Sequence, residues 1–178
     1  NAENNLRQTV PTLKVEFGDL MQLPEVIGPD VTKGRAFLSG VSADKPNEIL
    51  RRHLNENHGL YGVRDNEIRS LETISEYTNP DGNLSFATLA QTIDGIPVFA
   101  GEVKAAFTKR GEIVRVINDL LPESEISSLS SDFGTARDAV INSAAHIRYN
   151  PTKELAHNTV EIGGKYPKVT FGAGDFAT

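Results

Sequence analysis

The hydrophobic pattern of the 178-residue chain predicts one amphipathic helix in its first third. Asp44 is a candidate N-cap, Pro46 suits the first helical turn, and Gly59 marks the end. The expected apolar stripe, at helical spacing, consists of Ile49, Leu50, His53 and Leu54. This helix is the element against which a sheet could pack.

Four segments after this helix carry the pattern of β-strands with at least one buried face. Turn-forming residues separate the segments: Asn79-Pro80-Asp81-Gly82, then Asp94-Gly95, then Lys109-Arg110-Gly111. The expected strands are residues 68–77, 84–93, 98–108 and 112–118. We therefore predict an α+β fold in which the helix packs on a curved antiparallel sheet.

The third and fourth strands carry apolar residues on both faces. In the third strand, Val103, Ala105 and Phe107 face one way, and Lys104, Ala106 and Thr108 face the other. In the fourth, Val114 and Val116 share one face, and Ile113 and Ile117 share the opposite face. We expect the helix to cover one side of the sheet. For the other side two alternatives are open: the N-terminal region or a second module covers it, or it is a surface on which a partner docks.

The flanking regions have different patterns. Residues 1–40 contain several turn formers and one alternating segment, residues 13–17, and are expected to form an extended arm with an edge strand. Residues 122–134 form a connector that is acidic and contains no basic residue. Beyond it, Thr135 is a candidate N-cap for a helix over 136–149, and strands are expected at 159–162 and 168–171. This plan predicts a second, partial helix-plus-sheet unit.

Charge and composition narrow the functional classes. A net charge of −6 argues against a nucleic-acid partner, and no apolar run reaches the roughly 20 residues that span a bilayer. The absence of cysteine excludes disulfides and thiolate chemistry. The polar first residues suit a mature chain whose signal peptide has been removed, so a secreted, extracellular location is expected.

The chemistry-bearing residues do not form a catalytic pattern. His53 and His58 lie five residues apart on one helix, about 140° around it, which is unsuitable for zinc ligands. The metallopeptidase motif His-Glu-x-x-His and the serine-hydrolase motif Gly-x-Ser-x-Gly are both missing. Asp94 is explained as a turn residue, and Glu102 is either a strand-surface charge or a partner contact. We therefore expect no catalytic, metal-binding or cofactor-binding residue in this chain.

The stretch from Gln91 to Val103 (QTIDGIPVFAGEV) is the most distinctive in the sequence. It resembles the propeptide module of fungalysin- and thermolysin-type zinc metallopeptidases, the FTP domain, and is fungalysin-like more than thermolysin-like. Residues 49–63 and 84–122 carry the resemblance, and residues 135–147 resemble the first helix of a PepSY domain. The signature residues, which are possible partner contacts, are Asp94, Gly95, Ile96, Pro97, Val98, Phe99, Gly101 and Glu102. Ala100 stands where the family often has a second glycine.

The resemblance implies a domain plan and a function. It assigns residues 1–40 to an N-terminal arm, 41–121 to a cystatin-like FTP domain, 122–134 to the connector, and 135–178 to a truncated PepSY-like domain. The implied function is that of a propeptide acting as intramolecular chaperone and inhibitor of its cognate peptidase catalytic domain, which would hold the zinc. An alternative is a stand-alone PepSY-like module that inhibits proteases or binds another protein. An enzyme or small-molecule binder would instead need polar residues converging inside the sheet, where the pattern is apolar.

Overall fold

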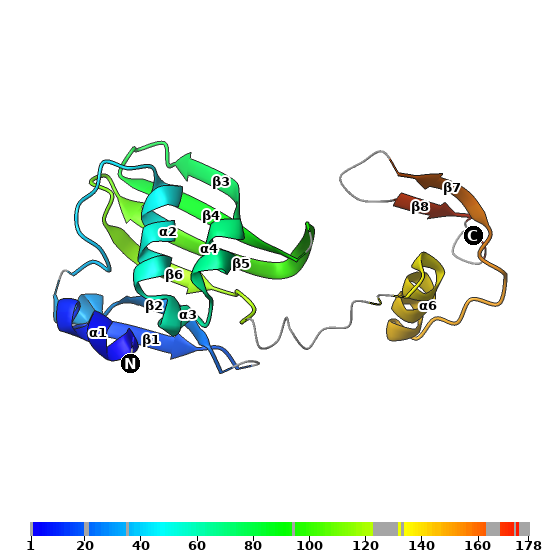
Figure 1. The fold of residues 1–178 in the computed structure, drawn as a ribbon, viewed down its shortest axis with the longest axis horizontal. Helices are drawn as coiled ribbons and strands as arrows, with labels where there is room; N and C mark the ends of the chain where they lie inside the picture. Colours follow the sequence, from blue (N-terminus) through cyan, green and yellow to red (C-terminus); the bar gives the residue numbers. More distant parts are fainter. Residues whose placement is uncertain are drawn as a thin grey trace. The chain divides into compact units, whose positions relative to one another are not determined.

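The computed structural model describes residues 2–19, 22–34, 36–93, 95–122, 132, 134–162, 168–172 and 174 (Figure 1). They belong to two compact units, Asn1–Ser128 and Leu129–Thr178. The first unit has a six-stranded antiparallel sheet and the second a two-stranded one. This architecture confirms the predicted α+β class.

In the first unit, the strands of the large sheet are ordered β1-β2-β6-β5-β4-β3. Their bounds are β1 (Leu13–Phe17), β2 (Pro24–Pro29), β3 (Glu72–Thr78), β4 (Leu84–Ile93), β5 (Ile96–Thr108) and β6 (Ile113–Asn118). The helices are α1 (Ala2–Thr9), α2 (Pro46–Glu56), α3 (His58–Tyr61) and α4 (Asp65–Ser70), with a 3₁₀ turn η1 (Val31–Lys33). All neighbouring strands run antiparallel.

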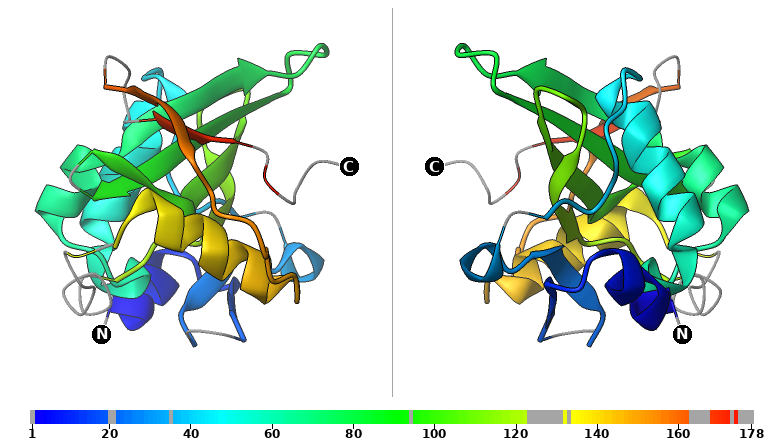
Figure 2. Two further views of the ribbon diagram at one scale, coloured as in Figure 1. Left: turned by 90° about the vertical axis from the view of Figure 1, so that its right-hand side faces the viewer. Right: turned by 90° about the vertical axis from the view of Figure 1, so that its left-hand side faces the viewer.

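The core lies between α2 and one face of this sheet (Figures 1 and 2). From the helix, Leu50 and Leu54 are completely buried, as the helical stripe predicted. From the sheet, Leu89, Val103 and Phe107 meet them. Burying each of these large side chains contributes about 2 kcal/mol, so the α2–sheet contact holds the first unit together.

Residues 1–40 do more than the extended arm that the sequence predicted. They form α1 and two strands, β1 and β2, and β2 joins β6 through the pairs Val26–Ile117 and Ile27–Val116. Ile27 is fully buried, and Leu6 and Val10, four residues apart on one side of the chain, also enter the core. The region is therefore part of the sheet and of its core.

Three local predictions were wrong at the ends of elements. Gly59, predicted to end the helix, lies within α3, and α2 already ends at Glu56. The N-cap of α2 is Lys45 and not Asp44, because Pro46 takes the first helical position and the cap must precede it. Asp44 instead pairs with Arg52, with 2.8 Å between the carboxylate and the guanidinium. Ile68, predicted to start the first strand of the meander, lies on α4 and buries its side chain in the core.

The prediction that Ile113 faces away from Val116 was wrong, because a bulge in the β5–β6 pair puts both side chains in the core. Ala106 pairs with Arg115 and Phe107 with Ile113, so Val114 is an extra residue on β6. Because one extra residue reverses the side-chain alternation, Ile113 turns inward and is completely buried. Ile117 is 38% exposed on the outer face, opposite Lys104.

The outer face of the sheet remains partly apolar and exposed. Tyr77 stacks on Phe86 with 4.8 Å between ring centroids, and Tyr77 is 58% exposed. A shallow hollow of about 360 Å³ lies beside this pair, bordered by Lys104 and Arg115. The N-terminal strands extend the sheet at its edge and do not lie over this face.

The second unit contains α6 (Ala136–His146), β7 (His157–Glu161) and β8 (Lys168–Phe171). Thr135 caps α6 as predicted: its hydroxyl accepts from the Asp138 N–H at 3.1 Å. The helix ends three residues before the predicted end at Tyr149. Most of the predicted acidic connector lies outside the described residues.

His53 is a core residue. It is 2% exposed, more deeply buried than the pattern indicated, and its Nε2 shares a hydrogen bond with the Tyr61 hydroxyl at 2.8 Å. Desolvation lowers the pKa of His53 from 6.5 to about 4 and raises the pKa of Tyr61. Both side chains are therefore neutral in the folded chain at neutral pH.

This buried histidine predicts a loss of stability in mild acid. The unfolded chain, with a His53 pKa near 6.5, binds the proton more readily than the folded chain, whose His53 pKa is about 4. The stabilisation is complete above about pH 6.5 and is lost as the pH falls toward 4. Between about pH 7.5 and about pH 5, this group should lower the free energy of unfolding by about 2 kcal/mol.

Urea titrations of the wild type and of His53→Leu across this pH range measure the effect. Carboxylates contribute equally to both proteins, so the difference between the two curves isolates His53. The wild type should lose stability more steeply than the variant. Parallel curves would contradict a neutral, buried His53.

Candidate functional site

The distinctive motif of the sequence forms the hairpin between β4 and β5, which projects beyond the neighbouring strands (Figure 1). At its tip Ile93 pairs with Ile96 and Thr92 with Pro97, and further down Ala90 pairs with Glu102. Between these points, β5 has four residues, 98–101, where β4 has only Gln91. The sheet therefore contains a large bulge in the middle of the motif.

Gln91, which lies opposite the bulge on β4, is anchored by two hydrogen bonds. Its amide Nε2 donates to the Leu121 carbonyl at 3.0 Å, and the Leu121 N–H donates to its Oε1 at 3.0 Å. Gln91 is 3% exposed and Leu121 is half-buried, so both hydrogen bonds are partly buried. This pair of bonds ties β4 to the segment that follows β6, on the far side of β5.

The backbone of the bulge requires glycine at position 101 and contains one strained residue, Ala100. Gly101 is buried, and a Cβ at this position would lie 2.7 Å from Cγ1 of Val98, which is too close for any side chain. Ala100 has φ of 57°, in the left-handed region that costs a non-glycine residue about 1–2 kcal/mol. The bulge is therefore a defined, strained conformation.

This conformation exposes Phe99. Its side chain is 99% exposed, more than any other large hydrophobic side chain described, and Ile96 near the hairpin tip is 51% exposed. Leaving a phenylalanine in water forgoes about 2 kcal/mol of burial. A strained backbone that holds an aromatic ring in solvent is typical of a functional site.

A groove of about 630 Å³ lies beside Phe99. Its apolar surface comes from Phe99, Ala100, Leu23 and Leu121. Its charged groups are the carboxylates of Asp19, Glu25 and Asp119, and no basic residue is among those described as lining it. Asn118, 4% exposed, also lines the groove and donates from Nδ2 to the Pro24 carbonyl at 2.9 Å. The site thus joins an exposed ring to an acidic groove.

The structure brings most of the predicted signature residues together on one hairpin. Gly95 has φ of 78°, which confirms its role in the turn, while Asp94 lies outside the described residues. Pro97 lies in the second position of β5 and is exposed. Glu102 pairs with Lys104 at 2.9 Å, and this bond and charge raise the pKa of Lys104. Glu102 therefore forms an ion pair on the surface of the strand, which is the first of its two predicted roles.

Sequence reasoning missed the anchoring role of Gln91 and the acidic side of the groove. Ala87 and Leu89 are buried, and Gln91 continues their alternation onto the same face. A long amide at a core position is a signal that it anchors backbone groups. Asp19 and Glu25 carry no such signal, because only the folding of the N-terminal strands brings them to the hairpin.

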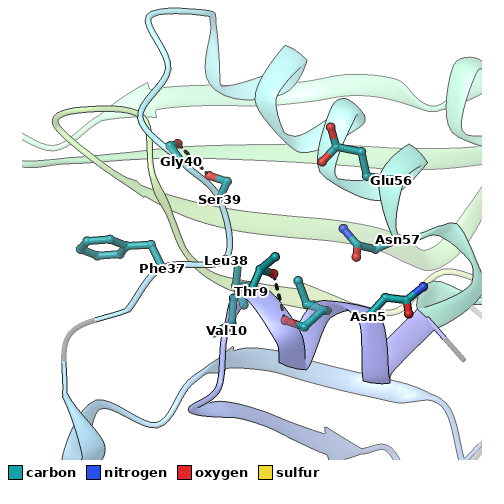
Figure 3. A pocket seen from close by; sticks show the side chains of 10 residues that line it. Asn5, Thr9, Val10, Phe37, Leu38, Ser39, Gly40, Glu56 and Asn57 are labelled. Atoms are coloured by element: carbon teal, nitrogen blue, oxygen red, sulfur yellow. Dashed lines mark hydrogen bonds between the residues drawn. The ribbon is translucent and has the colours of Figure 1, made fainter.

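A second pocket, of about 450 Å³, lies between α1, residues 37–40 and the end of α2 (Figure 3). Its hydroxyl groups are used locally: Thr9 donates to the Leu6 carbonyl at 3.0 Å, and Ser39 to the Gly40 carbonyl at 3.3 Å. Glu56 is the single carboxylate among the described residues that line it. This pocket therefore offers no acid–base pair.

Among the described residues, no three histidine, aspartate or glutamate side chains group as metal ligands. None of the helices in that part of the chain is long and apolar enough to cross a bilayer.

The strain at Ala100 predicts a stabilising substitution. Ala100→Gly should raise the free energy of unfolding by about 0.5–1 kcal/mol, because glycine adopts the left-handed region without penalty. Ala106→Gly is the matched control on the same strand, where φ is not positive; it should lower stability by about 1 kcal/mol. Urea unfolding compares the three proteins. A loss of stability in both variants would show that Ala100 is not strained.

Comparison with known proteins assigns a motif to this part of the chain. Searches of curated proteins and of solved structures found no match. The family model of the Fungalysin/Thermolysin Propeptide Motif matches residues 70–120, which contain β3 to β6 and therefore the whole bulged hairpin.

Proposed function

We propose that this chain is the propeptide region of a secreted zinc metallopeptidase of the fungalysin or thermolysin type, closer to fungalysin. It acts as intramolecular chaperone and inhibitor of the catalytic domain. The observation that carries the proposal is the match of residues 70–120 to the propeptide motif of these peptidases. The zinc and the catalytic residues belong to the partner domain.

The chemistry of the first unit suits recognition and not bond cleavage. Its most exposed large hydrophobic side chain is an aromatic ring, and the described residues that line the groove beside it are acidic, amide or apolar, with no serine, threonine, histidine or lysine among them. Such groups bind a protein surface by apolar contact and by charge.

A folded propeptide assists its peptidase in two ways. Secreted peptidases are kinetically stable and fold over a high barrier, so a domain that binds a native-like surface lowers that barrier. While the two domains share one chain, the effective concentration of the propeptide is of order mM, and a micromolar affinity keeps almost all of the enzyme bound. Cleavage of the linker removes this advantage.

The two units have different proposed parts in this function. The first unit carries the FTP motif, and its N-terminal strands complete the sheet. Residues 135–178 are proposed as the beginning of a PepSY-like domain, on the basis of the resemblance of their first helix.

The proposal predicts both inhibition and assisted refolding. The catalytic domain encoded in the same precursor, in mature form, is assayed with added chain; we expect inhibition with a Ki of about 1 μM or below. The same catalytic domain, unfolded in guanidinium and diluted, should recover about tenfold more activity when the chain is present.

The control is the variant Leu50→Asp, which places a charge at a fully buried core position and removes the fold. It should neither inhibit nor assist refolding. Absence of both effects with the wild-type chain at about 100 μM would contradict the proposal. Inhibition of unrelated zinc peptidases without any effect on refolding would instead favour a stand-alone inhibitory module.

A further inference from the structure

Phe99 stands out among the exposed hydrophobic side chains. Ile74, at a register shift of the edge strand β3, is 52% exposed, and Tyr77 on the same strand is 58% exposed, so each keeps about half of its surface covered. Phe99 has 99% of its surface in solvent and lies within the bulge of β5. Its exposure follows from the local backbone and not from the alternation of a strand.

The hairpin fixes the place of this ring before any partner arrives. Gly101 packs against Val98, Ala100 holds a left-handed conformation, and Gln91 is bonded twice to Leu121. Little backbone entropy is therefore lost on binding, and preorganised aromatic residues of this kind are the usual anchors of protein interfaces.

The charge beside Phe99 indicates which chemistry a partner surface would need. Asp19, Glu25 and Asp119 lie along one groove, and none of them takes part in an ion pair described for this chain. The cation that interacts with Asp119 is Lys104, whose pKa it helps to raise, and Lys104 already pairs with Glu102 at 2.9 Å. The groove therefore has an excess of negative charge next to an apolar surface.

Asn118 fixes one wall of the groove. It is 4% exposed, and its Nδ2 donates to the Pro24 carbonyl at 2.9 Å. Its Oδ1 is itself buried and is therefore not open to a partner. The acceptors that the groove offers are its carboxylates, which lie next to apolar carbon.

We infer that Phe99 is the anchor of the interface with the catalytic domain, and that the partner surface presents an apolar pocket for this ring beside a lysine or arginine. The cationic side chain enters the acidic groove, with its aliphatic stem against Leu23 and Leu121 and its charge between Glu25 and Asp119. This interface rests on the proposed function, and it names the residues and the chemistry by which the propeptide recognises its peptidase.

Binding of the mature catalytic domain to immobilised chain tests the interface. Phe99→Ala should weaken binding about 30-fold, as expected for a central anchor. It should leave the urea midpoint unchanged, because the ring contributes nothing to the core. Ile74→Ala, at an exposed apolar position on another strand, is the matched control and should bind like the wild type.

Charge reversal tests the groove separately. Glu25→Lys should weaken binding about tenfold at low salt and reduce the salt dependence of the affinity. Asp81→Lys makes the same change of charge in the exposed turn before β4 and should bind like the wild type. Equal effects of the two reversals would show a response to net charge alone and would overturn the role of the groove.

The outcomes separate this inference from the proposed function. If the wild type binds and Phe99→Ala binds equally well, the inference fails and the proposed function stands. If the wild-type chain binds no catalytic domain, both fail. If sedimentation shows a dimer of the chain that Phe99→Ala abolishes, the ring serves a second copy of the chain, and the inference is overturned.

Discussion

The pair of hydrogen bonds between Gln91 and the Leu121 backbone is the constraint on which the candidate site depends. These bonds join β4 to the segment after β6. Since β5 lies between β4 and β6, the bonds connect the two sides of the strand that carries the bulge. Because Gln91 is buried, breaking them would leave its amide without partners, at a cost of about 1–3 kcal/mol. The four residues of β5 opposite Gln91 can therefore stand out from the sheet without the strand separating from its neighbours.

The rest of the unit supports this arrangement from both sides. The α2 helix holds the inner face of β4 and β5 through fully buried leucines, so the strands below the bulge are rigid. The N-terminal strands extend the sheet and bring Asp19 and Glu25 beside the bulge. The result is a well-packed core with one strained, solvent-exposed feature, and the strain and the lost burial are concentrated at the proposed partner contact.

Much of the fold could be predicted from the sequence, because local patterns specify it. The alternation of residues 84–93 gives β4 with its observed bounds, and Thr135 gives the start of α6. Ile113 was placed on the wrong face, since the extra residue Val114 beside it on β6 reverses its side and leaves no mark in the alternation. The N-terminal strands were missed in part because their burial comes from contacts with β6, far away in the sequence. The hairpin motif was recognisable, whereas the groove beside it depends on those same long-range contacts.

Backbone ¹⁵N relaxation of the uncomplexed chain, measured at Phe99 and Ala100, is the most direct measurement of whether the bulge is preorganised. Order parameters of about 0.85, equal to those of the flanking strands, are expected if Gln91 and Gly101 hold one conformation. Values below about 0.6 at these two residues would mean that the bulge is formed only by a partner. In that case Phe99 would be part of a flexible loop and not a fixed anchor.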